Sequence, residues 1–170
     1  MRIDVLPEAL TAQTVALWHE VGLTRPWNDP DGDLRRALDG PASTVLAALD
    51  GDDLLGTAMV GHDGHRGWVY YLAVGPHVQR EGIGAALMRS CEQWCMDNGV
   101  PKIQLMVRST NAGVIAFYQR LGYEPSDVVV LGKFFATESR ALSFASSRRS
   151  GTSHMSATRT YRHTEISGLM

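Results

Sequence analysis

The stretch VGPHVQREGIGAALM, residues 74–88, constrains the fold of this chain more than any other. The aromatic and β-branched run from Trp68 to Val74 predicts a strand, and the apolar pattern from Gly82 to Asn98 predicts a helix. The pair Gly82 and Gly84 lies where the strand passes into the helix. A helix N-terminus offers unpaired N–H groups and a partial positive charge, and glycine lets an anion approach the backbone closely. The turn is therefore built like a phosphate cradle, although a plain tight turn also uses glycine.

The remaining pattern predicts a mixed α/β sheet with a crossover at its centre. Aromatic, β-branched or alternating segments predict five further strands, over residues 2–5, 44–49, 54–60, 102–107 and 127–131. Helical periodicity predicts helices over 7–21 and 111–121, and one or two helical turns over 34–38. The prolines and acidic residues of 24–33 predict a loop. Strands followed by strand–helix–strand–helix–strand is an order typical of such a sheet.

Composition narrows the class of protein. The 170 residues are 44% hydrophobic and 20% charged, with a net charge of −2, which gives no bulk electrostatic case for nucleic acid or an anionic membrane as partner. We find no apolar run long enough to span a membrane and no signal-peptide pattern in MRIDVLPEAL, and both favour the cytoplasm. The cysteines Cys91 and Cys95 are predicted to be buried thiols, and two sulfurs alone do not make a metal site, so no metal is expected.

Charge changes sign towards the C-terminus. Residues 1–135 carry 11 Lys and Arg against 16 Asp and Glu, whereas residues 136–170 carry 5 Arg against 2 Glu. The second segment is rich in Ser, Thr and Arg and has no sustained apolar period. We therefore expect one domain over 1–135 and a basic, weakly ordered extension over 136–170.

A second motif, NAGVIAFYQRLGY, spans Asn111 to Tyr123. On a helix Asn111 and Tyr118 are two turns apart, so an amide and a phenol share one face. An ordinary amphipathic helix with an exposed tyrosine would look the same.

Together the two motifs resemble those of the GNAT acetyltransferase superfamily. The series Gln79-x-x-Gly82-x-Gly84 is similar to its pyrophosphate loop, and Asn111, Ala116, Phe117-Tyr118 and Leu121-Gly122-Tyr123 are similar to its second signature. The segments RPWNDP (25–30) and DGHRG (63–67) further resemble a small bacterial YpeA-type subgroup. The resemblance covers residues 1–135 and implies a central, mostly antiparallel sheet with a parallel strand pair at its centre, flanked by helices.

The resemblance also implies an activity, the transfer of an acetyl group from acetyl-CoA to a primary amine by direct attack. It assigns the pantetheine arm to the backbone of Leu72, Ala73 and Val74 and to Asn111. It assigns the pyrophosphate to the turn residues Gln79, Arg80, Gly82, Ile83 and Gly84. Tyr118 would be the general acid for the leaving thiolate.

The general base is left open by the sequence. No carboxylate stands on the strand from Trp68 to Val74, and Asp63, His65, Glu20 or a water chain are the candidates. The residues expected to contact the acceptor are Trp27, Asn28, Asp63, His65 and Tyr70. The acceptor itself, a small-molecule or protein amine, is also open, as is a homodimer.

A protein that is no enzyme is the alternative. A silent acyl-CoA-binding sensor or interaction module would keep the phosphate turn without needing Tyr118. The presence of both the turn and the phenol favours catalysis.

Overall fold

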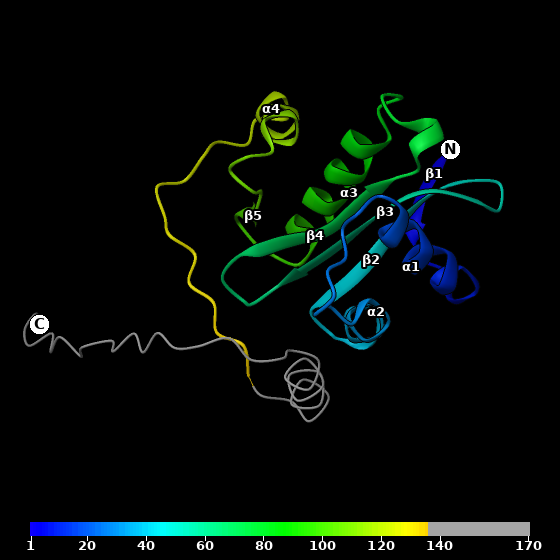
Figure 1. Cartoon of the computed structure of the whole chain (residues 1–170), viewed down its shortest axis with the longest axis horizontal. Helices are drawn as coiled ribbons and strands as arrows, with labels where there is room; N and C mark the ends of the chain where they lie inside the picture. The colour runs from blue at the N-terminus through cyan, green and yellow to red at the C-terminus, as the bar shows by residue number, and fades with distance from the viewer. Residues whose placement is uncertain (136–170) are drawn as a thin grey trace, which may run out of the picture. The chain divides into compact units, whose positions relative to one another are not determined.

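The structure, a computed structural model, describes residues 1–135. It divides the chain into two compact units, Met1–Pro125 and one that begins at Ser126. The first unit holds a five-stranded sheet in the order β1-β2-β3-β4-β5 (Figure 1). The strands are Arg2–Val5, Ser43–Asp50, Asp53–His62, Gly67–Val74 and Ile103–Leu105. Among the strands of residues 1–135, only β4 and β5 run parallel, so the prediction of a mixed, mostly antiparallel α/β sheet is confirmed.

Within the described residues, four α-helices flank the sheet: α1 (Thr11–Glu20), α2 (Pro30–Asp39), α3 (Ile83–Asp97) and α4 (Ala112–Arg120). Short 3₁₀ turns, η1 (Glu8–Leu10) and η2 (Pro76–Val78), precede α1 and α3.

Helix α2 begins four residues earlier than the sequence predicts, inside the predicted loop. Pro30 stands in its first turn and the Asp29 carboxylate accepts a hydrogen bond from the Gly32 N–H at 3.0 Å, so the residues that indicated a loop instead start a helix. Within residues 1–135 no helix is long and apolar enough to cross a membrane.

The predicted strand over Asp127–Leu131 is wrong, because the structure has no strand there. Its apolar side chains are largely exposed, with Val129 and Leu131 at 86% and 89%. A strand needs a partner for its backbone groups, and apolar β-branched residues alone do not supply one. Without this strand the parallel pair β4–β5 lies at the end of the described five-strand order rather than at its centre. The expected weakly ordered extension, 136–170, lies outside the described residues.

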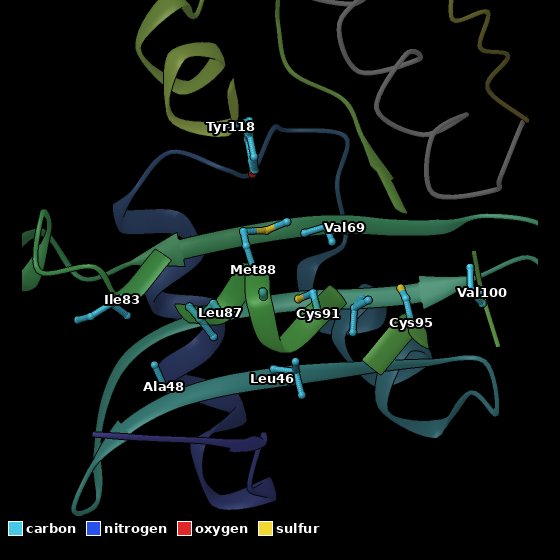
Figure 2. Close-up of a cluster of buried hydrophobic side chains, with 12 residues drawn as sticks. Leu46, Ala48, Val69, Ile83, Leu87, Met88, Cys91, Cys95, Val100 and Tyr118 are labelled. Atoms are coloured by element: carbon cyan, nitrogen blue, oxygen red, sulfur yellow. The ribbon is translucent and has the colours of Figure 1, made fainter. Parts of the chain in front are cut away.

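The sheet is buried on both faces. One core cluster lies between the strands and α3, and its buried members include Leu87, Met88 and Cys91 (Figure 2). The other cluster lies on the side of α1 and α2 around Trp18 and Leu34. Side chains alternate along a strand, so a run buried on both faces is almost continuously apolar, as β2 is (STVLAALD).

A β-bulge interrupts β4. Thr57 pairs with Ala73 and Met59 pairs with Tyr70, so Tyr71 and Leu72 oppose the single residue Ala58. Tyr71 takes a left-handed backbone conformation, with φ at 50°. The extra residue reverses which side chains of β4 point to each face of the sheet, so the residues on either side of the bulge follow opposite patterns.

Candidate active site

The turn between β4 and α3 leaves the start of α3 without a side-chain cap. Gly82 is the N-cap, with φ at 84°, and no side chain bonds there. Helices α2 and α4 differ, because the side chain of Asp29 caps α2 and that of Asn111 caps α4, whereas α1 also lacks a side-chain cap. The first N–H groups of α3 thus have no side-chain acceptor in the part of the chain that the structure describes. An anion can accept hydrogen bonds from them, which is what a phosphate cradle requires.

Gly84 has a packing role beside the phosphate role. A Cβ built on it would lie 3.4 Å from Cζ of Phe117 and 3.6 Å from Cγ2 of Val74. Glycine therefore lets the start of α3 lie close to both α4 and the end of β4. The neighbouring Gln79 donates from Nε2 to the Val74 carbonyl at 3.2 Å, which fastens the turn to the strand. Arg80 is exposed and its φ is 69°.

The open edge of β4, residues 70–74, lies beside this turn. Parallel pairing with β5 covers only Gly67 to Val69 on β4, and the last pair is Val69 with Leu105. Within residues 1–135, no strand pairs with 70–74 on that side. The candidate pantetheine residues Leu72, Ala73 and Val74 belong to this edge, where an extended amide-bearing chain can bond to the backbone.

Tyr118 lies buried against the same region. It is 8% exposed and projects from α4 towards α3 and β4 (Figure 2). Burial, with a smaller contribution from Cys91, raises the pKa of Tyr118 to about 12, so the phenol is protonated at neutral pH. Within residues 1–135 its hydroxyl makes no hydrogen bond, whereas the Tyr123 hydroxyl donates to Glu92 at 2.8 Å. The side chain is mostly buried, but its hydroxyl oxygen is not among the buried atoms without a partner, so the phenol is accessible and can donate to a bound group.

The helical spacing predicted that Asn111 and Tyr118 share one face of a helix, but Asn111 caps α4 and does not lie within it. Its Oδ1 accepts a hydrogen bond from the Val114 N–H at 3.3 Å. The residue is exposed. Its carbonyl oxygen is thus engaged by the helix, and only the amide N–H groups remain for a ligand.

A cavity of about 670 Å³ opens beside β4, among residues of α2, β3 and the β3–β4 turn. Of the predicted acceptor residues, Asn28, Asp63 and Tyr70 line this cavity, and Trp27 and His65 do not. Glu20, a candidate base at the end of α1, does not line it either.

Asp63 is held by its own turn. Its Oδ1 accepts hydrogen bonds from the N–H groups of His65 and Arg66 at 2.9 and 2.7 Å, and its Oδ2 accepts one from Trp68 Nε1 at 3.2 Å. These bonds, led by that from Arg66, lower the pKa of Asp63 to about 2. A carboxylate with so low a pKa is a weak base, so it is poorly suited to deprotonate an amine at neutral pH.

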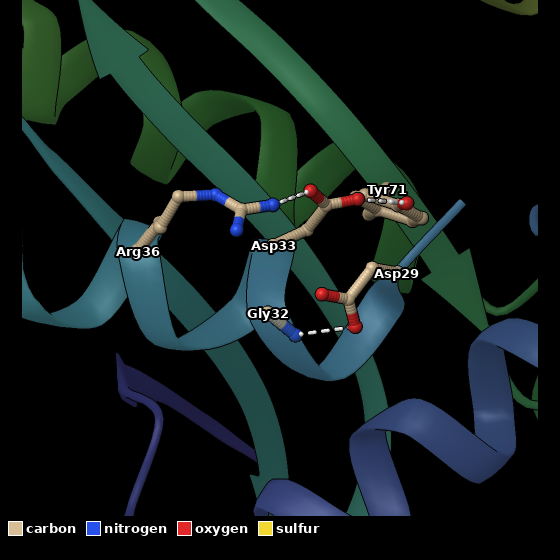
Figure 3. Close-up of polar contacts among 5 residues, drawn as sticks. All are labelled: Asp29, Gly32, Asp33, Arg36 and Tyr71. Carbon is tan, nitrogen blue, oxygen red and sulfur yellow. Dashed lines mark hydrogen bonds and ion pairs between the residues drawn. The ribbon is translucent and has the colours of Figure 1, made fainter. Parts of the chain in front are cut away.

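Sequence reasoning missed a network in the cavity wall. The Tyr71 hydroxyl donates to Asp33 Oδ2 at 2.8 Å, and Asp33 Oδ1 bonds to Arg36 (Figure 3). The Tyr71 ring stacks on Trp18 with centroids 4.0 Å apart. Burial and Asp33 raise the pKa of Tyr71. Only the bulge places Tyr71 on this face beside Tyr70, and nothing in the sequence WVYYLAV marks a bulge.

Comparison with known proteins identifies the class. Residues 12–123 match the model of the Acetyltransferase (GNAT) family. The chain belongs to this family. Its fold is shared by solved structures at low sequence identity. A transcriptional regulator from Bacillus halodurans C-125 has a TM-score of 0.68 at 17% identity, over 78% of this chain and 99% of that one.

Two aminoglycoside acetyltransferases share the fold as well. One, meta-AAC0020 from an uncultured soil metagenomic sample, was solved in complex with trehalose; its TM-score is 0.66 at 20% identity, over 80% of this chain and 96% of that one. The other, AAC(6')-Iy, was solved in complex with the bisubstrate analog CoA-S-monomethyl-acetylneamine; its TM-score is 0.67 at 15% identity, over 79% of this chain and 98% of that one.

Proposed function

We propose that the chain is an acetyl-CoA-dependent N-acetyltransferase that moves an acetyl group to a primary amine by direct attack, with Tyr118 as general acid. The observation that carries the proposal is Tyr118, which is 8% exposed and whose hydroxyl is protonated and without a hydrogen-bond partner in the described chain. Family membership and the fold shared with a protein solved with a CoA-containing analog support acetyl-CoA as the donor. We also assign the chain to the YpeA-type subgroup, and propose a cytoplasmic protein that can form a homodimer.

The residues divide the task of holding acetyl-CoA. The uncapped N–H groups of Gly82, Ile83 and Gly84 donate hydrogen bonds to the pyrophosphate oxygens, and Arg80 adds a positive charge. The backbone of 72–74 bonds the pantetheine amides along the open edge of β4. Asn111 contributes its amide N–H groups near the sulfur end.

The chemistry follows from this placement. The neutral amine nitrogen bonds to the thioester carbonyl carbon, and a backbone N–H near Val74 stabilises the resulting oxyanion. The carbon–sulfur bond then breaks and the thiolate takes a proton from Tyr118. The acylated nitrogen gives its extra proton to water in the cavity, and the Tyr118 phenolate regains a proton from water. An alkylammonium has a pKa of about 10.4, so it must lose a proton before attack. Because the pKa of Asp63 is about 2, we assign that proton to water in the cavity.

A screen of amines tests the proposal. Purified protein is incubated with acetyl-CoA and one amine at a time, and release of the CoA thiol is followed alongside the mass of the acceptor. Cys91 and Cys95, the chain's own thiols, are 0% and 3% exposed, so a thiol reagent reports CoA rather than protein. We expect release that depends on the amine and an acceptor that gains one acetyl group. Tight acetyl-CoA binding with no release for any amine class would instead favour the silent acyl-CoA-binding module.

A further inference from the structure

We propose that the cavity selects acceptors that carry a second cationic group, and that Asp63, Trp68 and Tyr70 hold this group. The proposal rests on the proposed function, because it names the class of amine that the same site takes. It requires a fixed negative charge, no cation that neutralises it, and apolar walls that suit an alkyl chain.

Asp63 provides a fixed charge with room for one more donor. A carboxylate has about four acceptor positions, and the bonds from His65, Arg66 and Trp68 use three of them. These bonds also lock the orientation of the carboxylate, so a ligand meets a preorganised anion. Its low pKa keeps Asp63 ionised throughout the neutral range.

The other charged groups of the cavity wall offset one another. Asp33 is paired with Arg36, which leaves little net charge at that end. His62 also lines the cavity, and its Nδ1 accepts a hydrogen bond from the Gly64 N–H at 3.2 Å. Within residues 1–135, no Lys, Arg or His lies within ion-pair distance of Asp63. Among the described residues that line the cavity, Asp63 is therefore the one charged group without an ion-pair partner.

Two aromatic rings stand beside this carboxylate. Trp68 and Tyr70 are two residues apart on β4 before the bulge, so they share the face that lines the cavity. Tyr70 is 45% exposed, and Asp63 contributes, after burial, to raising its pKa, which indicates that the phenol lies near the carboxylate. A cation between an aromatic face and a carboxylate is attracted by both.

The position of this group suits a long acceptor. Trp68 pairs with Gly61 and Ala73 pairs with Thr57, so Trp68 and Ala73 are separated by four residues of β3, roughly 13 Å at about 3.3 Å per residue. The reacting amine must reach the acetyl group near 72–74, while the second cation binds near Trp68. Acceptors with a cation at each end of an extended chain fit this spacing.

Three acceptors of equal length test the proposal: diaminooctane, aminooctanol and aminooctanoate, each with its functional groups at the two ends. Their dissociation constants with CoA present are measured by calorimetry, and kcat/KM is measured by CoA release. After correction for its two equivalent amines, we expect diaminooctane to exceed aminooctanol by about tenfold in both quantities, and aminooctanoate to be the poorest.

Variants locate the effect. Asp63→Asn is expected to reduce the diamine preference to about twofold or less. Asp52→Asn, the same charge change in the β2–β3 turn, is the matched control and should keep the preference. Tyr70→Leu leaves the hydrogen bonds of Asp63 intact and should reduce the preference partly, which covers the case in which Asp63→Asn does not fold.

The outcomes separate the two proposals. Equal affinity for the three compounds, or a preference that persists in folded Asp63→Asn, overturns the cation site. Selective binding of diaminooctane without CoA release from any acceptor keeps the cation site and contradicts the acetyltransferase. Equal turnover of all three acceptors supports the acetyltransferase and contradicts the cation site.

Discussion

At the scale of single residues, Tyr118 is the group on which the proposed chemistry depends. Tyr118→Phe keeps the ring and its edge-on contacts with Phe117 and Tyr123 but removes the hydroxyl. We expect kcat to fall by about 10²-fold with an amine whose acetylation is rate-limiting, within the usual range for general acid catalysis. Affinity for acetyl-CoA should change little, because the phosphates are held elsewhere. Full activity of Tyr118→Phe in this assay would show that Tyr118 is not the general acid and only lines the cofactor site.

The pKa of Tyr118 predicts a pH profile. The pKa is about 12 in the folded state, above the ordinary value of 10.0, so the phenol stays protonated up to about pH 10. We expect kcat/KM to rise with pH between 7 and 10 as the acceptor ammonium, with a pKa of about 10.4, loses its proton. A decline that begins near pH 8 while the protein remains folded would indicate a different acid.

The same shift links Tyr118 to stability. Because the folded-state pKa is raised, the stabilisation by the protonated phenol is complete below pH 10 and is lost as the pH rises towards 12. Rates are therefore compared below pH 10, with melting temperatures measured at each pH.

The sequence and the structure agree unevenly at this scale. Asn28 and Asp63 could be predicted as cavity residues because loops commonly line sites, and Tyr70 because the family resemblance suggested it. Tyr71 and Asp33 could not, since their contact spans 38 positions and depends on a bulge that no residue pattern marks. Asp63 looked like a possible base until its three hydrogen bonds showed why its pKa is low.

At the scale of elements, the start of α3 is the feature to test. Gly84→Asp places a negative charge beside the pyrophosphate, so CoA affinity should fall by about tenfold or more, about 1.4 kcal/mol. Its Cβ would also meet Phe117 at 3.4 Å, so packing must be separated from charge. Gly84→Ala adds the same Cβ without the charge and should keep affinity within about threefold. Both are measured by calorimetry, with melting temperatures as the check on folding.

If folded Gly84→Asp binds CoA with wild-type affinity, the assignment of the pyrophosphate to this turn is contradicted. Equal losses in the two variants would indicate that packing against α4, and not charge, sets the affinity.

The elements themselves were largely predictable, because periodicity reports burial. The strands β2, β3 and β4 follow their apolar runs, and α3 follows its stripe of Leu87, Cys91 and Cys95. The failures have physical causes. Pro30 marks both loops and helix starts, and the apolar run 127–131 has the composition of a strand without a pairing partner.

At the scale of the whole molecule, the compact unit Met1–Pro125 is expected to carry folding and acetyl-CoA binding. A chain that ends at Ala136 should melt within about 3 °C of the full chain, which corresponds to less than about 1 kcal/mol. Its acetyl-CoA affinity should be unchanged. Insolubility, or a much lower melting temperature, would show that residues beyond 136 stabilise the folded protein.

The most direct test of the acetyl-CoA site is hydrogen–deuterium exchange of the full chain with and without acetyl-CoA. Amides that bond a ligand exchange more slowly. We predict slower exchange in peptides that cover 72–84 and 111–118, and unchanged exchange in β1 and α1, which lie outside the proposed site. Unchanged exchange over 72–84 at saturating acetyl-CoA, or protection confined to other segments, would contradict the assignment of this turn and strand edge as the acetyl-CoA site.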